Sequence, residues 1–121
     1  MTIEIEHAPE FDKCMHHLRK FRTIVEDLAN FEKALLANFP DLKPWGLDVK
    51  VIPGFGAEYV EVYKARKFRC RYLNCSDKIR LIYTYNSERE KIIFIEIYFK
   101  GDRENHDANL IKRYLIKKGV K

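Results

Sequence analysis

Three β-strand patterns follow one another closely in the second half of the chain, and this spacing limits the possible folds more than any other feature. The patterns span residues 59–70, 78–85 and 91–100 and are rich in β-branched and aromatic residues. The segments between them, LNCSD and NSERE, consist of residues that favour turns. A parallel pair would need a crossover of about a dozen residues or more. The sequence therefore predicts an antiparallel meander of three strands.

Two helical patterns precede the meander. The alternation in TIEIEH, residues 2–7, predicts a short first strand, and Pro9 follows at a position that the first turn of a helix tolerates. Thr23 and Glu26 have the spacing of a capping box, which predicts a second helix from Thr23 to the residue before Pro40. We expect the two helices to form an antiparallel hairpin. Its apolar stripe comprises Phe11, Met15, Leu18, Phe21, Val25, Leu28, Phe31, Leu35 and Phe39.

The remaining segments complete the order of elements. Residues 40–56 are rich in Pro and Gly and are predicted to form a loop. Near the C-terminus, Asp107 is suited to cap a helix whose apolar face begins at Leu110 and Ile111. The order βααβββα predicts an α+β fold in one domain over residues 1–121. It combines a small, mostly antiparallel sheet with an N-terminal helical hairpin packed on one side and a C-terminal helix.

Composition argues against several classes of protein. Apolar residues make up 46% of the chain and charged residues 34%, which fits a folded globular protein. No apolar run is long enough to span a bilayer, and the N-terminus MTIEIEHAPE lacks the features of a signal peptide. Cys14, Cys70 and Cys75 are sparse and odd in number, as expected of reduced thiols, and they lack zinc-site spacing. We expect a cytoplasmic protein with no membrane contact, metal or cofactor.

Positive charge is concentrated in the second half of the chain. Residues 1–60 hold 7 Lys+Arg against 10 Asp+Glu, a net charge of −3, whereas residues 61–121 hold 16 against 8, a net charge of +8. An excess confined to the predicted sheet indicates a local surface that binds an anion. The alternative is a solvated face that is merely basic.

The first strand of the meander carries the densest cations. Strand periodicity places Lys64, Arg66 and Phe68 on one face and Lys67 and Arg69 on the other. An antiparallel neighbour in suitable register would bring Arg80 next to the first pair. Cations this close repel one another unless an anion joins them, so the pattern favours a phosphate or carboxylate partner. Alternatively, cross-strand glutamates neutralise them, the candidates being Glu58, Glu61 and Glu96.

A second candidate site follows the last strand, in the segment YFKGDRENHD of residues 98–107. Lys100, Arg103 and His106 lie in this turn before the last helix, where a scaffold commonly presents reactive groups. His106 can change its protonation state near neutral pH, as a general acid or base must. The alternative is an ordinary exposed loop histidine.

The order of elements, with the segments VYKARKF, KIRLIYTYN and IFIEIYFKGDRENHD, resembles the RelE/ParE superfamily of type II toxin–antitoxin toxins. The resemblance covers most of the chain in topology and residues 62–115 in motif. For the RelE-like branch it implies a metal-independent endoribonuclease (mRNA interferase) that acts on mRNA, typically on the ribosome. It also implies neutralisation by a cognate acidic antitoxin protein, and it leaves monomer and homodimer open.

The resemblance also implies roles for individual residues. Lys64 and Arg66 match the paired cations of the first long strand, and Arg80 matches the arginine that opens RLIY. His106 stands where the family often has a tyrosine, while Tyr114 lies further along. The implied catalytic residues are Lys64, Arg66, Arg80 and His106. The implied substrate-binding residues are Lys67, Arg69, Lys100 and Arg103.

Three rival functions share these features. A ParE-like toxin inhibits DNA gyrase and cleaves nothing, on the same fold. A non-catalytic member would bind only RNA or its antitoxin. A generic βα RNA-binding domain would contact backbone charge and stack bases on aromatics, the candidates being Phe68, Tyr72, Tyr83 and Tyr85.

Overall fold

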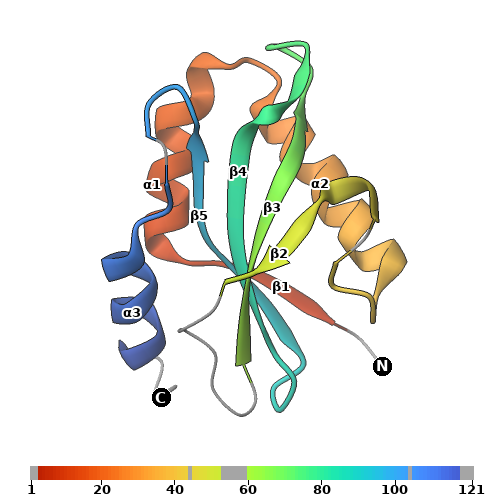
Figure 1. Ribbon diagram of the computed structural model, residues 1–121, viewed down its shortest axis with the longest axis vertical. Helices are drawn as coiled ribbons and strands as arrows, with labels where there is room; N and C mark the ends of the chain where they lie inside the picture. The colour runs from red at the N-terminus through yellow and green to blue at the C-terminus, as the bar shows by residue number, and fades with distance from the viewer. Residues whose placement is uncertain (1–2, 44, 53–59, 104, 118–121) are drawn as a thin grey trace.

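The computed structural model describes residues 3–43, 45–52, 60–103 and 105–117, without the side chains of residues 45, 60 and 114–117. Within these residues, two short 3-10 helices accompany three α-helices and five strands (Figure 1). In chain order the elements are β1 (Glu4–His7), α1 (Pro9–His17), η1 (Leu18–Lys20), α2 (Ile24–Asn38), η2 (Trp45–Leu47), β2 (Val49–Val51), β3 (Val60–Cys70), β4 (Cys75–Asn86), β5 (Lys91–Phe99) and α3 (Ala108–Lys117).

The strands form one sheet in the order β1-β5-β4-β3-β2. β3, β4 and β5 pair antiparallel as the predicted meander, and β1 pairs parallel with β5 at the edge. The α+β class and the predicted arrangement of helices are confirmed. The predicted loop over residues 40–56 was wrong in part, since Val49 pairs with Ala65 and makes β2 an edge strand. Only three residues pair there, too few to show a strand period in a Pro- and Gly-rich segment.

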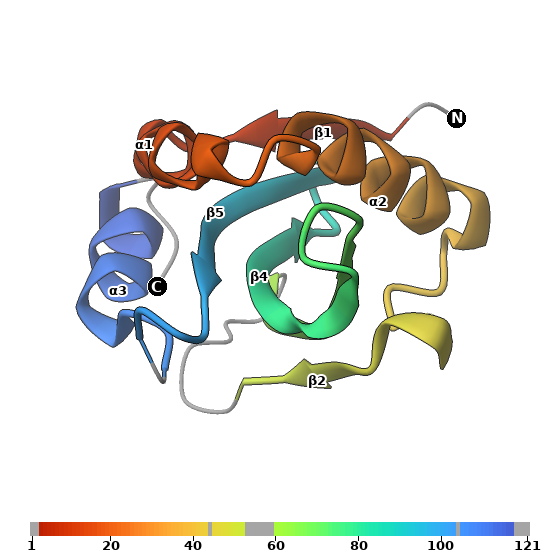
Figure 2. The ribbon, with the colours of Figure 1, turned by 90° about the horizontal axis from the view of Figure 1, so that it is seen from above.

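The core lies between one face of the sheet and the two N-terminal helices. Figure 2 shows α1 and α2 over the same face, with α3 beside β5. The ring of Phe31 on α2 lies 5.5 Å from Phe68 and 6.0 Å from Phe94, measured between centroids. Burying a side chain of this size contributes about 2 kcal/mol. Val25 was wrongly placed in the apolar stripe, because it is 57% exposed while its neighbour Ile24 is buried.

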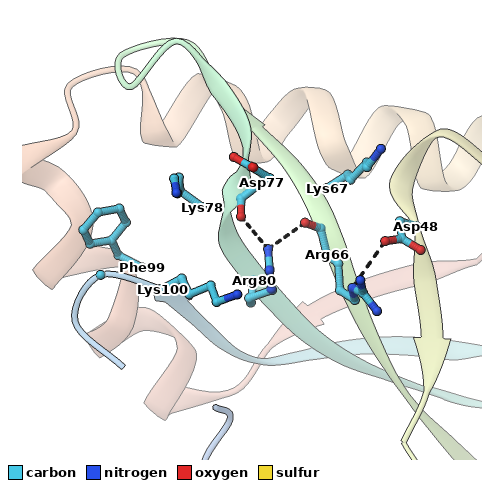
Figure 3. Close-up of a pocket in the computed structure, with 9 residues that line it drawn as sticks. Asp48, Arg66, Lys67, Asp77, Lys78, Arg80, Phe99 and Lys100 are labelled. Carbon is cyan, nitrogen blue, oxygen red and sulfur yellow. Dashed lines mark hydrogen bonds and ion pairs between the residues drawn. The ribbon is translucent and has the colours of Figure 1, made fainter. Parts of the chain in front are cut away.

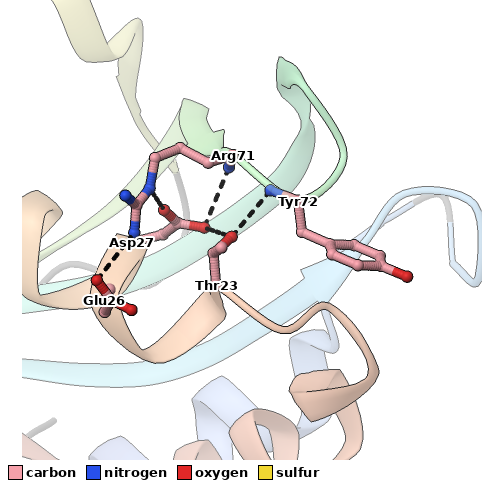
Figure 4. Close-up of polar contacts among 5 residues, drawn as sticks. All are labelled: Thr23, Glu26, Asp27, Arg71 and Tyr72. Carbon is pink, nitrogen blue, oxygen red and sulfur yellow. Dashed lines mark hydrogen bonds and ion pairs between the residues drawn. The ribbon is translucent and has the colours of Figure 1, made fainter.

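A polar network joins the start of α2 to the turn between β3 and β4 (Figure 4). The buried Asp27 accepts hydrogen bonds from Thr23 Oγ1 (2.7 Å), Arg71 Nε (2.9 Å) and Arg71 N (3.2 Å). Thr23 Oγ1 in turn accepts a bond from the backbone N–H of Tyr72 at 2.8 Å. The predicted capping box is therefore wrong: the Thr23 hydroxyl makes no cap bond to its own helix. Its bonds serve a tertiary contact instead.

Candidate functional site

A bulge in β3 arranges the cations of the meander. Ala65 pairs with Leu81 and Phe68 with Ile79, so Arg66 and Lys67 together oppose Arg80. The extra residue reverses the alternation along the strand. Phe68 is thereby buried in the core, and the predicted face shared by Lys64, Arg66 and Phe68 is wrong.

The bulge opens onto a cleft of about 500 Å³ that we call the basic cleft (Figure 3). It is lined by Arg66, Lys67, Lys78, Arg80 and Lys100, with Asp48, Asp77, Phe99 and Gly101. These five cations face two carboxylates, so the cleft has a positive balance. Four of the implied site residues, Arg66, Lys67, Arg80 and Lys100, line this cleft.

Arg80 is fixed at the centre of the basic cleft. One guanidinium nitrogen donates to the carbonyl oxygens of Arg66 and Asp77, both at 2.8 Å (Figure 3). Arg66 forms an ion pair with Asp48 of 3.3 Å, from Nε to Oδ2. Carbonyl oxygens leave the Arg80 charge unneutralised, so it can still attract an anion while its position is held.

A second group of side chains borders the basic cleft on the same sheet face. The register aligns Lys64, Ile82 and Glu96 across three strands, and Arg80 with Tyr98 in the next row. Lys64 Nζ lies 3.4 Å from Nδ1 of His106, in the loop before α3. We call Lys64, Glu96, Tyr98, Arg103 and His106 the lysine–histidine cluster.

Burial and neighbouring positive charges lower the pKa values of two side chains in this cluster. Burial lowers the pKa of Lys64, and the charges of Arg80 and Arg66 lower it further. Burial also lowers the pKa of His106 below its ordinary value near 6.5, and the Lys64 charge adds to that effect. The His106 imidazole is therefore neutral at pH 7. A neutral imidazole beside several cations can transfer a proton.

Glu96 holds the loop that carries His106. Its buried carboxylate pairs with the Arg103 guanidinium through Oε2 and accepts the Asp107 N–H through Oε1 at 3.0 Å. Asp107 then caps α3, accepting the Leu110 N–H at 3.0 Å, which confirms the predicted cap. The loop and the start of α3 are thus both tied to β5.

The alternative of neutralising cross-strand glutamates is not what the structure describes. Glu96 pairs with Arg103, and Glu61 accepts the Tyr63 hydroxyl at 2.9 Å. Glu58 lies outside the described residues. Within the described ranges, Lys64 and Arg80 form no ion pair with a carboxylate. The basic face keeps most of its charge.

Tyr98 is a member of the cluster that sequence reasoning missed. Two cations lie within cation–π distance of its ring centroid, the Arg103 Cζ at 4.7 Å and the Lys64 Nζ at 5.8 Å. Its buried hydroxyl makes no hydrogen bond to any residue that the structure describes. Burial and the Glu96 charge raise the pKa of this hydroxyl to about 12. A tyrosine in an apolar strand carries no sequence signal for such a position.

The other predicted residues lie as follows. Lys67 lines the basic cleft, but Arg69 lies in a separate cleft beside α2. Phe68 and Tyr83 are buried in the core and cannot stack on bases, whereas Tyr72 is exposed. The side chain of Tyr114 lies outside the described part of the chain.

Three further observations concern metals, thiols and membranes. Over the described residues, no three His, Cys, Asp or Glu side chains lie together as metal ligands. Cys14, Cys70 and Cys75 are free thiols. None of the helices described is long and apolar enough to cross a membrane.

Comparisons with known proteins support the fold. No protein-family model and no curated protein sequence matches the chain. Among solved structures, the chain is similar to RelE in the archaeal RelE–RelB complex from Pyrococcus horikoshii OT3. The two share 20% sequence identity with a TM-score of 0.59, over 84% of this chain and 98% of the other. The chain therefore has a RelE-like fold, in agreement with the resemblance that its sequence motifs indicate.

Proposed function

We propose that the protein is the toxin of a type II toxin–antitoxin pair and cleaves mRNA in the cytoplasm, on the ribosome. The observation that carries this proposal is the 3.4 Å contact between Lys64 Nζ and His106 Nδ1, beside the basic cleft of a RelE-like fold. A histidine suited to proton transfer thus adjoins a cationic surface suited to phosphate. That combination suits cleavage of an RNA phosphodiester.

The proposed reaction is attack of a ribose 2′-OH on the adjacent phosphate. The P–O5′ bond breaks, and the products are a 2′,3′-cyclic phosphate and a free 5′-OH. One proton leaves the 2′-OH and another joins the 5′-oxygen. His106 is the proposed proton-transfer group, because its lowered pKa keeps it neutral and able to accept a proton.

Cations would stabilise the charge that builds up on phosphorus. Lys64 and Arg80 are assigned to this role, and each such donor is typically worth about 3 kcal/mol. Arg66, in the bulge, would orient the phosphate. The flanking RNA backbone would contact Lys67, Arg69, Lys100 and Arg103. Arg103 contributes chiefly by holding Glu96 and the loop, since its guanidinium is already paired.

A cognate antitoxin is part of the proposal. The RelE of similar fold is part of a RelE–RelB complex. A partner that covers the basic cleft would need acidic residues to complement its cations. A gene for a small acidic protein beside the gene for this chain would support the pairing.

The test is induction of the chain in bacteria while transcript ends are mapped. Wild type is compared with His106→Ala, Arg80→Ala and the control Lys33→Ala, an exposed lysine on α2. We expect growth arrest with new mRNA ends for wild type and the control. His106→Ala should slow cleavage on the order of 100-fold. Because Arg80 also bonds two carbonyls, the soluble level of its variant is measured alongside.

Two other outcomes would contradict the proposal. Growth arrest without new transcript ends would indicate a different target, such as DNA gyrase. A folded wild type that neither arrests growth nor cleaves RNA would indicate a member that only binds. Repeating the cleavage with purified protein, with and without ribosomes, decides whether the ribosome is required.

A further inference from the structure

A second cleft lies between α2, η2 and β3, with a volume of about 490 Å³, and we call it the α2 cleft. Its lining includes the apolar side chains of Ala34 and Leu47, and the polar side chains of Asn30 and Ser76. Gly46 also lines it, and a Cβ at that position would meet no atom of the described residues within 4 Å beyond its chain neighbours, so a larger side chain can be placed there. The cleft is large enough for a small ligand.

Two cations at this cleft are not neutralised. Lys67 and Arg69 are exposed, and within the residues that the structure describes neither forms an ion pair or a side-chain hydrogen bond. Arg71, which also lines the cleft, differs because Asp27 and Glu26 hold its guanidinium. The two unneutralised cations therefore favour an anionic ligand.

The α2 cleft adjoins the basic cleft. Lys67 lines both, because the bulge places it beside Arg66 and opposite Arg80. A polyanion bound at the basic cleft can therefore continue across β3 and reach the α2 cleft. This continuity indicates one extended ligand rather than two small ones.

The lining chemistry fits a nucleotide better than an acidic peptide. The amide of Asn30 and the hydroxyl of Ser76 each both donate and accept hydrogen bonds. The edges of an unpaired nucleobase also present both donors and acceptors, and its faces pack on apolar groups such as Ala34 and Leu47. The carboxylate side chains of an acidic peptide only accept hydrogen bonds, so they would leave the acceptor atoms of Asn30 and Ser76 unused.

We propose that the α2 cleft binds one nucleotide of single-stranded RNA, next to the nucleotide whose phosphate occupies the basic cleft. Lys67 then contacts the backbone between them, and Arg69 contacts the next phosphate. The inference rests on the proposed function, since it takes RNA as the ligand of the basic cleft. It extends that proposal by specifying the path of the bound RNA from the basic cleft across β3 to the α2 cleft.

The test measures binding of 2′-O-methyl RNA, which cannot be cleaved, to the full chain by fluorescence anisotropy. Gly46→Leu adds a large side chain at a residue that lines the α2 cleft without changing any charge, and Arg69→Gln removes one cation. We expect Gly46→Leu to weaken the binding of an RNA of about eight nucleotides on the order of 10-fold. Binding of a mononucleotide, which is too short to occupy both clefts, should be unaffected. Arg69→Gln should reduce the magnitude of the salt slope by about 0.7, one phosphate contact to a single strand. Lys33→Gln, outside both clefts, is the control.

The outcomes separate this inference from the proposed function. If Arg80→Ala abolishes RNA binding while neither Gly46→Leu nor Arg69→Gln changes it, the inference is overturned and the proposed function stands. If wild type binds no RNA, both are overturned. If Gly46→Leu weakens the binding of a glutamate-rich peptide but not that of RNA, the cleft binds a protein partner and the inference is overturned. Should Gly46→Leu fail to fold, the salt slope of Arg69→Gln decides alone.

Discussion

Lys64 Nζ lies 3.4 Å from Nδ1 of His106, which joins a cation of β3 to the loop before α3. The two residues lie far apart in sequence and meet because Glu96 ties that loop to the sheet. Burial lowers the pKa of both groups, and the Lys64 charge lowers that of His106 further. The electrostatic state of the imidazole therefore depends on a residue of the sheet.

Lys64→Gln should raise the pKa of His106. The substitution removes a positive charge that disfavours the imidazolium, while burial remains, so the pKa should rise toward 6.5 without reaching it. NMR titration of the His106 ring protons measures the shift. Lys33→Gln, which removes an exposed charge on α2, should leave the His106 pKa unchanged. A His106 pKa that falls or stays constant in Lys64→Gln would contradict the assigned cause.

Glu96→Gln should shift the same pKa in the opposite direction. The Glu96 charge raises the pKa of His106, so its removal should lower that pKa further. The free energy of unfolding should also fall by about 2 kcal/mol, because Arg103 loses a charged partner beside a buried side chain. The same NMR titration, with urea unfolding, measures both effects. A rise of the pKa toward 6.5 would instead show that the loop has opened to solvent.

The meander and the approach of Arg80 to Lys64 and Arg66 could be predicted because their signals are local. Strand alternation and short turns fix antiparallel neighbours, and register then brings Arg80 near Lys64 and Arg66. The cap of α3 was also predictable, since Asp107 and the Leu110 N–H it accepts lie three residues apart. Signals of this kind require no knowledge of distant contacts.

Features that depend on contacts between distant segments could not be predicted. The bulge at Arg66 and Lys67 inserts one residue that only the partner strand reveals. Thr23 has the spacing of a capping box, yet its hydroxyl bonds Asp27 and the N–H of Tyr72. The burial of Tyr98 among cations likewise results from a loop that folds back onto β5. In each case tertiary structure overrides a local preference.

Two tyrosine-to-phenylalanine substitutions should have different effects on stability. The buried Tyr83 hydroxyl donates a hydrogen bond of 2.6 Å to the carbonyl oxygen of Leu42, so Tyr83→Phe should cost about 1–2 kcal/mol. The Tyr98 hydroxyl has no such partner among the described residues, so Tyr98→Phe should change the free energy of unfolding by less than about 0.5 kcal/mol. Urea unfolding of the two variants gives the comparison. An equal loss in both would show that the Tyr98 hydroxyl is bonded in solution.

Asp27→Ala should destabilise the fold more than the removal of an exposed carboxylate. The Asp27 side chain is 1% exposed and accepts three hydrogen bonds: two from Arg71, which join α2 to the turn after β3, and one from Thr23 at the start of α2 (Figure 4). Its removal leaves the Arg71 N–H and the Thr23 hydroxyl without their acceptor, at a cost of about 2–4 kcal/mol. Asp27→Asn keeps an acceptor and should lose about half as much.

Equilibrium unfolding in urea measures these losses against Glu88→Ala, an exposed carboxylate in the turn between β4 and β5. That control should stay within about 0.5 kcal/mol of wild type. Thr23→Val adds a second check, because the hydroxyl bonds both Asp27 and Tyr72 N. In the background of Asp27→Ala, Thr23→Val should cost less than it does alone, since the two side chains act through one network. Strict additivity of the two losses would show that Thr23 stabilises the turn through Tyr72 alone.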